Sequence, residues 1–479
     1  MTRILKPALL FPLLFALLLA ARLCHVGVLW AEETLPLAAA QQIHYGALLY
    51  RDIWFDKPPL APLLYTALGD PAWLLRTTGA LYALLCCGLA FGFARDLWSE
   101  REGLWAACLL AFFLIFDFPS SVIPLAADLL MLAPHLAAVW MAWKRRPLWA
   151  GALAGVAFAV NPKGLLLLAV CACWSLVGSG IAWNSLAALL AGFLAVTGSV
   201  SAWLWATGAL PAYWNEVWLW GRVYAGTTFV SSPLHNGLLR TLNWAGFHSA
   251  LIVAAGMALY RDRRESSAWR WGLWMLLSFA GIAAGMRFFP RYYFQLLPLA
   301  VLLAARGFAG LQAAPQPRAR IAALALALLL AVPLLRFTPP YAMAARATSQ
   351  RDTAMDRDSR AAAALLSAAA QPGDTLFVWG YRPEIYVYSR LRAATRYLDS
   401  QPLTGVPADR HLTQSTPVES TQSRERRAEL ARARPTFLVD GLGPYNPLLS
   451  PGQFPELQPW LADYGEIART AGSVIYRRK

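Results

Sequence analysis

Residues 8–33 read ALLFPLLFALLLAARLCHVGVLWAEE, an apolar run that ends directly in an acidic pair. A spanning helix needs about 20 mostly apolar residues, so this run is long enough to cross a bilayer. A signal peptide is the alternative, because Arg3 and Lys6 precede the run and small residues lie near its end. We favour a membrane span, because many further apolar runs follow and Arg22 interrupts the region that would be cleaved.

The composition of the whole chain supports this interpretation. Of the 479 residues, 58% are hydrophobic and 14% are charged, and the mean hydropathy is +0.43. Soluble domains have about 45–50% apolar and about 25% charged residues, so most of this chain cannot be a soluble enzyme fold. The formal net charge of +15 would suggest nucleic acid in a soluble protein, but basic residues also gather in the cytoplasmic loops of membrane proteins.

Apolar runs of spanning length recur along residues 1–340, and we predict about eleven spanning helices. They begin near Leu9, Trp73, Gly103, Pro124, Leu148, Gly164, Ile181, Thr241, Trp271, Phe294 and Ile321. Residues 148–178 could instead form one long helix. The predicted fold class is therefore mostly α, a multi-pass membrane helical bundle.

Basic residues gather on alternate connections between these spans. They are Arg3, Lys6, Arg95, Arg101, Lys144 to Arg146, Arg261 to Arg270, Arg318 and Arg320. The positive-inside rule makes that side cytoplasmic. The N-terminus is then inside, and an odd number of spans places residues 341–479 outside a cytoplasmic (inner) membrane.

Two outer regions have patterns of their own. In the first outer loop, stretches 34–47 and 59–69 are amphipathic and predict helices lying at the membrane interface. After Pro339-Pro340 the composition changes, and short apolar strands alternate with helices. Strands are predicted at Thr375–Trp379, Pro435–Val439 and Ser473–Tyr476, a helix at Pro383–Arg390, and a mobile polar loop at 404–427. Residues 341–479 therefore predict a small extracytoplasmic α/β domain.

Acidic residues are scarce, and four of them fall near the outer interface: Glu32, Glu33, Asp56 and Asp128. An ionisable group within a span costs about 2.5–3.5 kcal/mol on insertion scales, so Asp128 is a candidate functional residue. Carboxylates at one depth could supply a general base or hold a divalent cation, Mg²⁺ or Mn²⁺. A solvated loop for the Glu pair and an ion pair for Asp128 are the structural alternatives.

Basic residues on the outer side run against the positive-inside trend. They are Arg51, Lys57, Lys163, Arg222, Arg240, Arg287 and Arg291. Such cations suit a membrane-anchored phosphate, because Arg binds it bidentately and Lys acts as a point charge. In Arg287-Phe-Phe-Pro-Arg291-Tyr292, the aromatic rings add a surface on which a sugar could stack. The alternative for each cation is contact with lipid headgroups.

Several other site classes are absent from the sequence. No Gly-rich phosphate loop, HExxH or GxSxG motif occurs. The six cysteines all fall in apolar stretches, without zinc spacing or flanking histidines, and are assigned to core packing. No metal ligand set is assigned, and no nucleic acid is expected as a partner.

Taken in order, the motifs resemble the GT-C family of polyprenyl-phosphate-sugar-dependent glycosyltransferases, in the branch with protein O-mannosyltransferases, the lipid A aminoarabinose transferase and Rgt-type transferases. Four features carry the resemblance: Glu32-Glu33 followed by HYGALLYRD at 44–52, Asp56-Lys57-Pro58, Asp128, and RFFPRYYFQLLP at 287–298. It covers roughly residues 8–340. The departures are Glu32 where Asp is usual, Arg291 where His is usual, and a shorter first loop.

The resemblance implies transfer of a sugar, with inversion, from a polyprenyl-phosphate donor to a cell-envelope glycan, lipid or protein. Catalytic roles would fall to Glu32, Asp56 and Asp128, with Glu32 as the base. Lys57, Arg287 and Arg291 would bind the donor phosphate, and Glu33 and Tyr292 would contact substrate. A secondary transporter or flippase is the alternative, although such folds tend to have internal repeats and midplane charges. A non-catalytic scaffold would not explain the grouped charges.

Overall fold

The computed structural model describes residues 6–175, 183–226, 232–265, 268–313, 317–346, 353–408 and 412–479. The chain divides into two compact units, each assembled from separate segments. The helical unit comprises Met1–Gly27, Ala72–Ala202 and Ser232–Thr348, and the mixed unit comprises Val28–Pro71, Trp203–Ser231 and Ser349–Lys479. Arg3, one of the basic residues used for the topology, lies outside the described residues.

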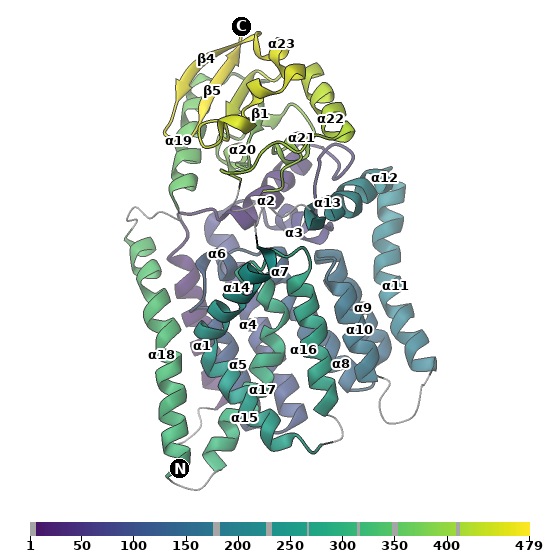
Figure 1. The fold of residues 1–479 in the computed structure, drawn as a ribbon, viewed down its shortest axis with the longest axis vertical. Coiled ribbons are helices and arrows are strands. Elements are labelled where there is room, and N and C mark those ends of the chain that lie inside the picture. Colours follow the sequence, from purple (N-terminus) through teal and green to yellow (C-terminus); the bar gives the residue numbers. More distant parts are fainter. Residues whose placement is uncertain are drawn as a thin grey trace. The chain divides into compact units, whose positions relative to one another are not determined.

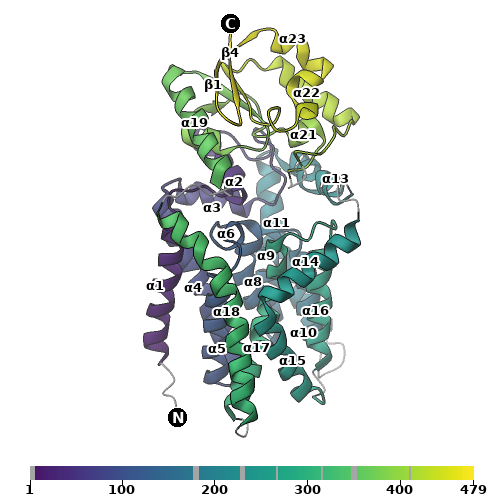
Figure 2. The same ribbon diagram turned by 60° about the vertical axis from the view of Figure 1, so that its left-hand side comes forward.

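The helical unit is a bundle in which α4, α5 and α17 run side by side and pack on one another (Figures 1 and 2). Its longer helices are α1 (Pro7–Leu23), α4 (Ala72–Leu97), α5 (Glu100–Phe113), α8 (Leu132–Trp143), α9 (Pro147–Val160), α10 (Gly164–Ser175), α11 (Trp183–Ala206), α14 (Pro233–Phe247), α15 (Ser249–Asp262), α16 (Ala268–Ala283), α17 (Leu297–Ala313) and α18 (Arg318–Ala345). Three short elements join them: α6 (Pro119–Val122), α7 (Ala127–Leu130) and the 3₁₀ helix η2 (Pro290–Gln295).

Among the described residues of this unit, three helices are long and apolar enough to cross a membrane: Ala72–Leu97, Trp183–Ala206 and Ala319–Ala345. Helices α14 and α15 meet at 85° and would count as a fourth span if taken together. The remaining apolar helices are shorter, so the count of eleven spans stays a prediction. Residues 148–178 do not form one helix, because α9 ends at Val160 and α10 begins at Gly164.

Glycines let neighbouring helices of the bundle approach closely. A Cβ at Gly151 on α9 would lie 1.8 Å from the carbonyl oxygen of Leu189 on α11, and one at Gly192 on α11 would lie 2.0 Å from the carbonyl oxygen of Leu148. Small residues at helix contacts are typical of membrane bundles, where van der Waals packing replaces the hydrophobic effect as the source of association. The α9–α11 pair therefore depends on two residues that have no side chain.

The mixed unit contains a five-stranded sheet of order β2-β1-β3-β5-β4. Its strands are β1 (Thr375–Trp379), β2 (Arg392–Ala393), β3 (Phe437–Asp440), β4 (Tyr464–Arg469) and β5 (Val474–Arg478). Strands β2, β1 and β3 are parallel, and the hairpin β4–β5 adds in the antiparallel sense. The three predicted strands thus coincide with β1, β3 and β5. The domain boundary predicted at residue 340 stays a prediction.

Helices of the mixed unit come from all three of its segments. They are α2 (Ala31–His44), α3 (Leu60–Leu68), α12 (Leu210–Tyr213), the π-helix η1 (Trp214–Leu219), α13 (Trp220–Gly226), α19 (Ala354–Ala369), α20 (Glu384–Ser389), α21 (Gln401–Thr404), α22 (Thr421–Arg432), α23 (Gln458–Leu461) and the 3₁₀ turns η4 to η6 (Pro447–Leu449, Pro451–Gln453, Pro455–Leu457). Part of the predicted loop 404–427 is helical, since Ser420 caps α22. Residues 409–411 of that loop lie outside the described residues.

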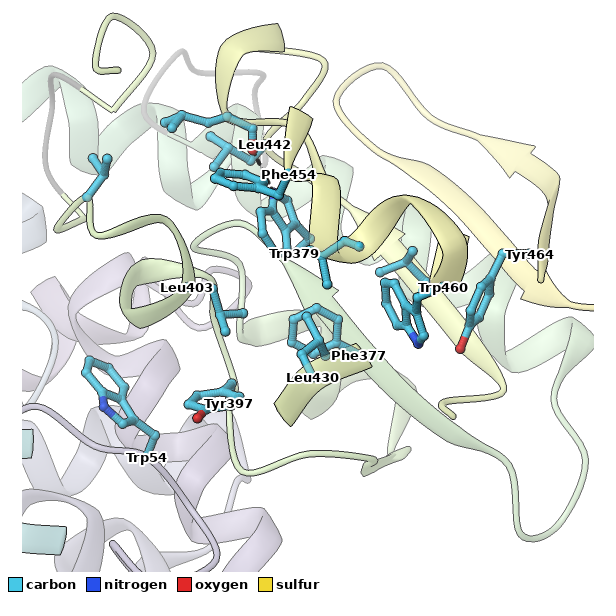
Figure 3. Packing of buried hydrophobic residues seen from close by; sticks show 14 of the residues in the cluster. Trp54, Phe377, Trp379, Tyr397, Leu403, Leu430, Leu442, Phe454, Trp460 and Tyr464 are labelled. Carbon is cyan, nitrogen blue, oxygen red and sulfur yellow. Dashed lines mark hydrogen bonds between the residues drawn. The ribbon is translucent and has the colours of Figure 1, made fainter. Parts of the chain in front are cut away.

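One aromatic core joins the segments of the mixed unit. Trp54 of the first loop and Trp220 of α13 share it with Phe377 and Trp379 of β1, and with Tyr397 beyond β2 (Figure 3). The Trp54 and Trp220 rings meet edge to face with centroids 5.5 Å apart. Large rings bury 150–250 Å² each and dominate core energetics, so the first loop is anchored in this core.

The first-loop helix α2 differs from the prediction of an amphipathic interfacial helix. Every residue from Glu33 to Gln42 is buried, because α3 packs against α2 and so does α20 of the C-terminal segment. Gln42, a polar residue of this helix, finds its hydrogen-bond partners within the protein. The Gln42 amide accepts from Ala393 N at 2.9 Å and donates to Leu391 O at 3.5 Å.

Candidate functional site

The acidic pair begins helix α2, and its two members have different surroundings. Glu33 is fully buried, and its carboxylate accepts a hydrogen bond from Trp30 N at 2.9 Å, which caps the helix. Glu32 is partly exposed on the same first turn, and its charge acts on Lys57. A carboxylate at a helix N-terminus is stabilised by the helix dipole. Glu33 therefore holds the start of α2, and Glu32 keeps a partly exposed carboxylate; the catalytic role of Glu32 and the substrate contact of Glu33 stay predictions.

Asp56 and Lys57 form an ion pair at the end of the first loop. Lys57 Nζ lies 2.9 Å from Asp56 Oδ1, and the lysine side chain stays 42% exposed while the aspartate side chain is 9% exposed. Burial lowers the pKa of Lys57, but the Asp56 and Glu32 carboxylates outweigh it and the pKa is raised. Lys57 is therefore a permanent cation beside two of the predicted catalytic acids.

The peptide chain before this pair is held in a tight turn. Tyr50 is buried with φ of 65°, a left-handed conformation that costs a non-glycine residue free energy. Its hydroxyl donates to the Lys57 carbonyl at 2.6 Å. Asp52 accepts from Leu48 N at 2.9 Å, which closes the other side of the turn. The Tyr-Arg-Asp motif thus shapes the segment that presents Lys57.

Three residues near this turn were missed by the sequence analysis. The Glu216 carboxylate accepts from Phe55 N at 2.9 Å, and Arg396 donates to Glu216 and to Tyr50 O. Asp399 is fully buried and accepts from Gln401 N at 2.9 Å. Burial, together with the negative charge of Asp56, raises the pKa of Asp399 to about 7 despite the opposing charge of Lys57. Glu216 had a usable signal, because it is a rare acid inside an aromatic-rich stretch.

Asp128 lies in the helical unit, in a second cluster. Its side chain is 7% exposed, and its carboxylate faces Lys163 Nζ at 3.5 Å and Arg291 Nε at 3.4 Å. Asn161 Nδ2 donates to the same carboxylate at 3.1 Å. Two cations on one carboxylate leave this group with net positive charge. The structural alternative for Asp128, an ion pair, is what the structure contains.

The cations of this second cluster also lie against aromatic rings. Lys163 Nζ is 3.4 Å from the centroid of the Tyr292 ring, and the Arg291 guanidinium is 4.6 Å from that of Phe289. A cation over a ring is attracted by the ring's quadrupole. Tyr292 is 8% exposed, and its ring contacts the Lys163 ammonium in this arrangement. Its predicted contact with substrate stays a prediction.

Arg287 precedes this cluster in a strained turn. It is 4% exposed, and both of its neighbours, Met286 (φ 52°) and Phe288 (φ 49°), have left-handed backbone conformations. Such strain persists only where surrounding contacts over-determine it and is concentrated at functional sites. Here Phe288 fits against Gly237, where a Cβ would come within 2.6 Å of the ring.

The predicted site residues therefore fall into two groups. Glu32, Asp56 and Lys57 share the mixed unit, and Asp128, Arg291 and Tyr292 share the helical unit with Lys163. Convergence of all three catalytic acids stays a prediction. Within the described residues, no three His, Cys, Asp or Glu side chains are grouped so that they could hold a metal ion.

Solved structures share this fold along nearly the whole chain. ArnT from Cupriavidus metallidurans bound to undecaprenyl phosphate matches with a TM-score of 0.60 and 17% identity, over 98% of this chain and 97% of that one. Arabinofuranosyltransferase AftD from mycobacteria matches with a TM-score of 0.53 and 17% identity, over 99% and 40%. The Archaeoglobus fulgidus oligosaccharyltransferase in complex with Zn and sulfate matches with a TM-score of 0.51 and 12% identity, over 98% and 73%.

These similarities confirm the expected fold, which is the GT-C fold of membrane glycosyltransferases. No protein-family model matches the chain, and no curated protein matches it in sequence. At such low identity the likeness concerns the fold alone.

Proposed function

We propose that this membrane chain with a GT-C fold transfers a sugar from a polyprenyl-phosphate donor to an acceptor of the cell envelope. The observation that carries the proposal is the end-to-end fold match with ArnT, whose structure holds undecaprenyl phosphate. The cationic clusters at Lys57 and at Lys163–Arg291 support it, because a membrane-anchored phosphate needs such partners. The acceptor, whether glycan, lipid or protein, is left open.

In the proposed reaction, an acceptor hydroxyl gives its proton to Glu32 and its oxygen attacks the anomeric carbon of the donor. The bond from that carbon to the phosphate oxygen breaks, and the polyprenyl phosphate leaves with the electron pair. Attack opposite the leaving group inverts the anomeric configuration. Proton transfer to a positioned carboxylate typically contributes 10²–10⁴-fold to the rate.

Charge develops on the phosphate as it leaves, and preorganised cations stabilise it. Lys57 is one such cation, held by Asp56 at the end of the first loop. The sequence motif predicts Arg287 and Arg291 as further phosphate-binding residues, and within the helical unit Asp128 orients Arg291 through their 3.4 Å contact. Asp56 in turn orients Lys57.

A transporter or flippase for a lipid-linked anion is less well supported. The fold matches described above are with transferases, and the predicted acids lie on loops and short helices rather than at the middle of long spans. A flippase would leave the carrier intact, whereas a transferase releases free polyprenyl phosphate. Product analysis therefore separates the two.

The testing experiment compares donors with the purified protein in lipid nanodiscs. We expect turnover with a polyprenyl-phosphate sugar and none with the matching nucleotide sugar. Turnover with the nucleotide sugar in the absence of any lipid carrier would contradict the proposal, because the sugar would then be transferred without a polyprenyl-phosphate donor.

The acidic pair allows a matched comparison of neighbouring residues. We expect Glu32→Gln to abolish transfer without changing the melting temperature. Glu33→Ala should instead lower stability by about 0.5–2 kcal/mol, the cost of losing a helix cap, and retain activity. Melting curves and turnover measured on the same preparations check both. Full activity of Glu32→Gln would remove this residue from the mechanism.

A further inference from the structure

The segment that carries Asp56 and Lys57 is fastened at several backbone atoms. We call residues 50–57 the strap. The Trp54 amide donates to the Arg396 carbonyl at 2.7 Å, and the Phe55 amide donates to Glu216 at 2.9 Å. The hydroxyl of Tyr50, the first residue of the strap, donates to the carbonyl of Lys57, its last residue. The position of Lys57 therefore follows from where these backbone groups are held.

Arg396 and Glu216 together hold both ends of the strap. The Arg396 guanidinium donates to Glu216 and to the Tyr50 carbonyl, and Glu216 is 3% exposed. Arg396 belongs to the segment after β2, and Glu216 belongs to the π-helix η1. π-Helical turns occur frequently at functional sites, because they re-aim side chains out of the regular helical register. Both residues are more than a hundred positions away from the strap in the sequence.

We propose that Arg396 and Glu216 are positioning residues for Lys57, and that the C-terminal α/β segment thereby helps to build the donor-phosphate site. This inference rests on the proposed role of Lys57. The pair makes three hydrogen bonds to the strap backbone, at Tyr50 O, Trp54 N and Phe55 N, while the ammonium of Lys57 pairs with Asp56. A displacement of about 1 Å in a reacting geometry can cost 10²-fold in rate, so a loosened strap should weaken donor use strongly.

The test uses the full chain in nanodiscs, with undecaprenyl phosphate as the binding probe. We expect Arg396→Met to raise the Kd for undecaprenyl phosphate about tenfold or more. Arg396→Lys should restore most of the affinity, because one ammonium can bridge Glu216 and the Tyr50 carbonyl. Arg392→Met is the matched control, since Arg392 is an exposed residue of β2 that lies over the Tyr45 ring, and its Kd should not change.

A second readout reports on the strap itself. Trypsin can cut after Arg51, which is exposed within the strap, but not after Lys57, which precedes a proline. We expect faster cutting after Arg51 in Arg396→Met and in Glu216→Gln than in the wild type and in Arg392→Met. Melting temperatures measured alongside identify a variant that has lost its fold. If Arg396→Met has lost its fold, Arg396→Lys is compared with the wild type instead.

Unchanged affinity and unchanged cutting in Arg396→Met would overturn the positioning role. If the wild type itself does not bind undecaprenyl phosphate, the proposed function fails at its donor. The trypsin comparison then still decides whether Arg396 and Glu216 hold the strap. The two failures are therefore distinguishable.

Discussion

At the scale of single residues, Lys57 is the cation whose loss should affect the donor most. Lys57→Ala removes a charge-assisted contact to the phosphate, worth about 1.5–3 kcal/mol, and should reduce donor turnover by roughly ten- to a hundredfold. Lys57→Arg should also be impaired, because a planar guanidinium does not replace a point charge on a proline turn. Arg392→Ala is the control, as Arg392 is an exposed cation of β2 in the same unit. Steady-state kinetics with the lipid donor measure all three.

Asp399 should make the stability of the protein depend on pH. Its pKa of about 7 in the folded state lies above the ordinary aspartate value of 3.8, because the charged form is buried near Asp56. Between these two values the folded state binds more protons than the unfolded state, so stability falls as pH rises from about 4 to 7. Asp399→Asn should flatten that decline. Melting temperatures across this pH range test it, and an equally steep decline in the variant would assign the effect to other groups.

At the scale of elements, the contact between α9 and α11 makes a sharp prediction about glycines. Gly192→Ala places a Cβ about where a backbone oxygen already lies, 2.0 Å from Leu148 O, and should destabilise the bundle by about 1–3 kcal/mol. Gly198→Ala on the same helix meets nothing within 4 Å and should be neutral or slightly stabilising. Thermal unfolding in one detergent compares them, and equal melting temperatures would contradict the packing argument.

Elements also show what the sequence could predict. Strand β1 was found at its observed bounds because TLFVW is a short apolar run between polar residues and glycine. Strand β4 was missed because YGEIAR is largely exposed and does not alternate clearly. Helix α2 was assigned to the interface because residues 34–47 have an amphipathic pattern. A local pattern does not contain the partner of Gln42, which lies about 350 residues further along the chain.

The candidate site also has residues that a local sequence pattern can reveal and residues that it cannot. Short motifs were enough to single out Glu32, Asp56, Lys57 and Arg291 as candidates, because scarce charges stand out in an apolar chain, and their roles stay predictions. The sequence around Arg396 and Asp399, ATRYLDSQ, has no unusual feature. Their importance comes from long-range packing of the mixed unit. Positioning residues of this kind are visible in a folded structure and not in a pattern.

At the scale of the whole molecule, the predicted topology can be tested by cysteine labelling. Gln422→Cys on the exposed face of α22 should react with a membrane-impermeant maleimide in intact cells, because residues 341–479 are predicted outside. Arg263→Cys, exposed on a connection predicted inside, should react after permeabilisation. The wild type, whose six cysteines lie in apolar stretches, sets the background. Protection of Cys at position 422 in intact cells would reverse the assignment.

The interleaved segments of the mixed unit also have a consequence for biosynthesis. The hydrogen-bond partner of the Gln42 amide, Ala393, is synthesised 351 residues later. At about 5–20 residues per second, the ribosome needs roughly 20–70 s to make that stretch. During this interval the buried face of α2 has no native cover from the C-terminal segment. A chain that terminates before residue 393 would therefore leave the buried face of α2 exposed. Chaperones and proteases would then act first on its first loop.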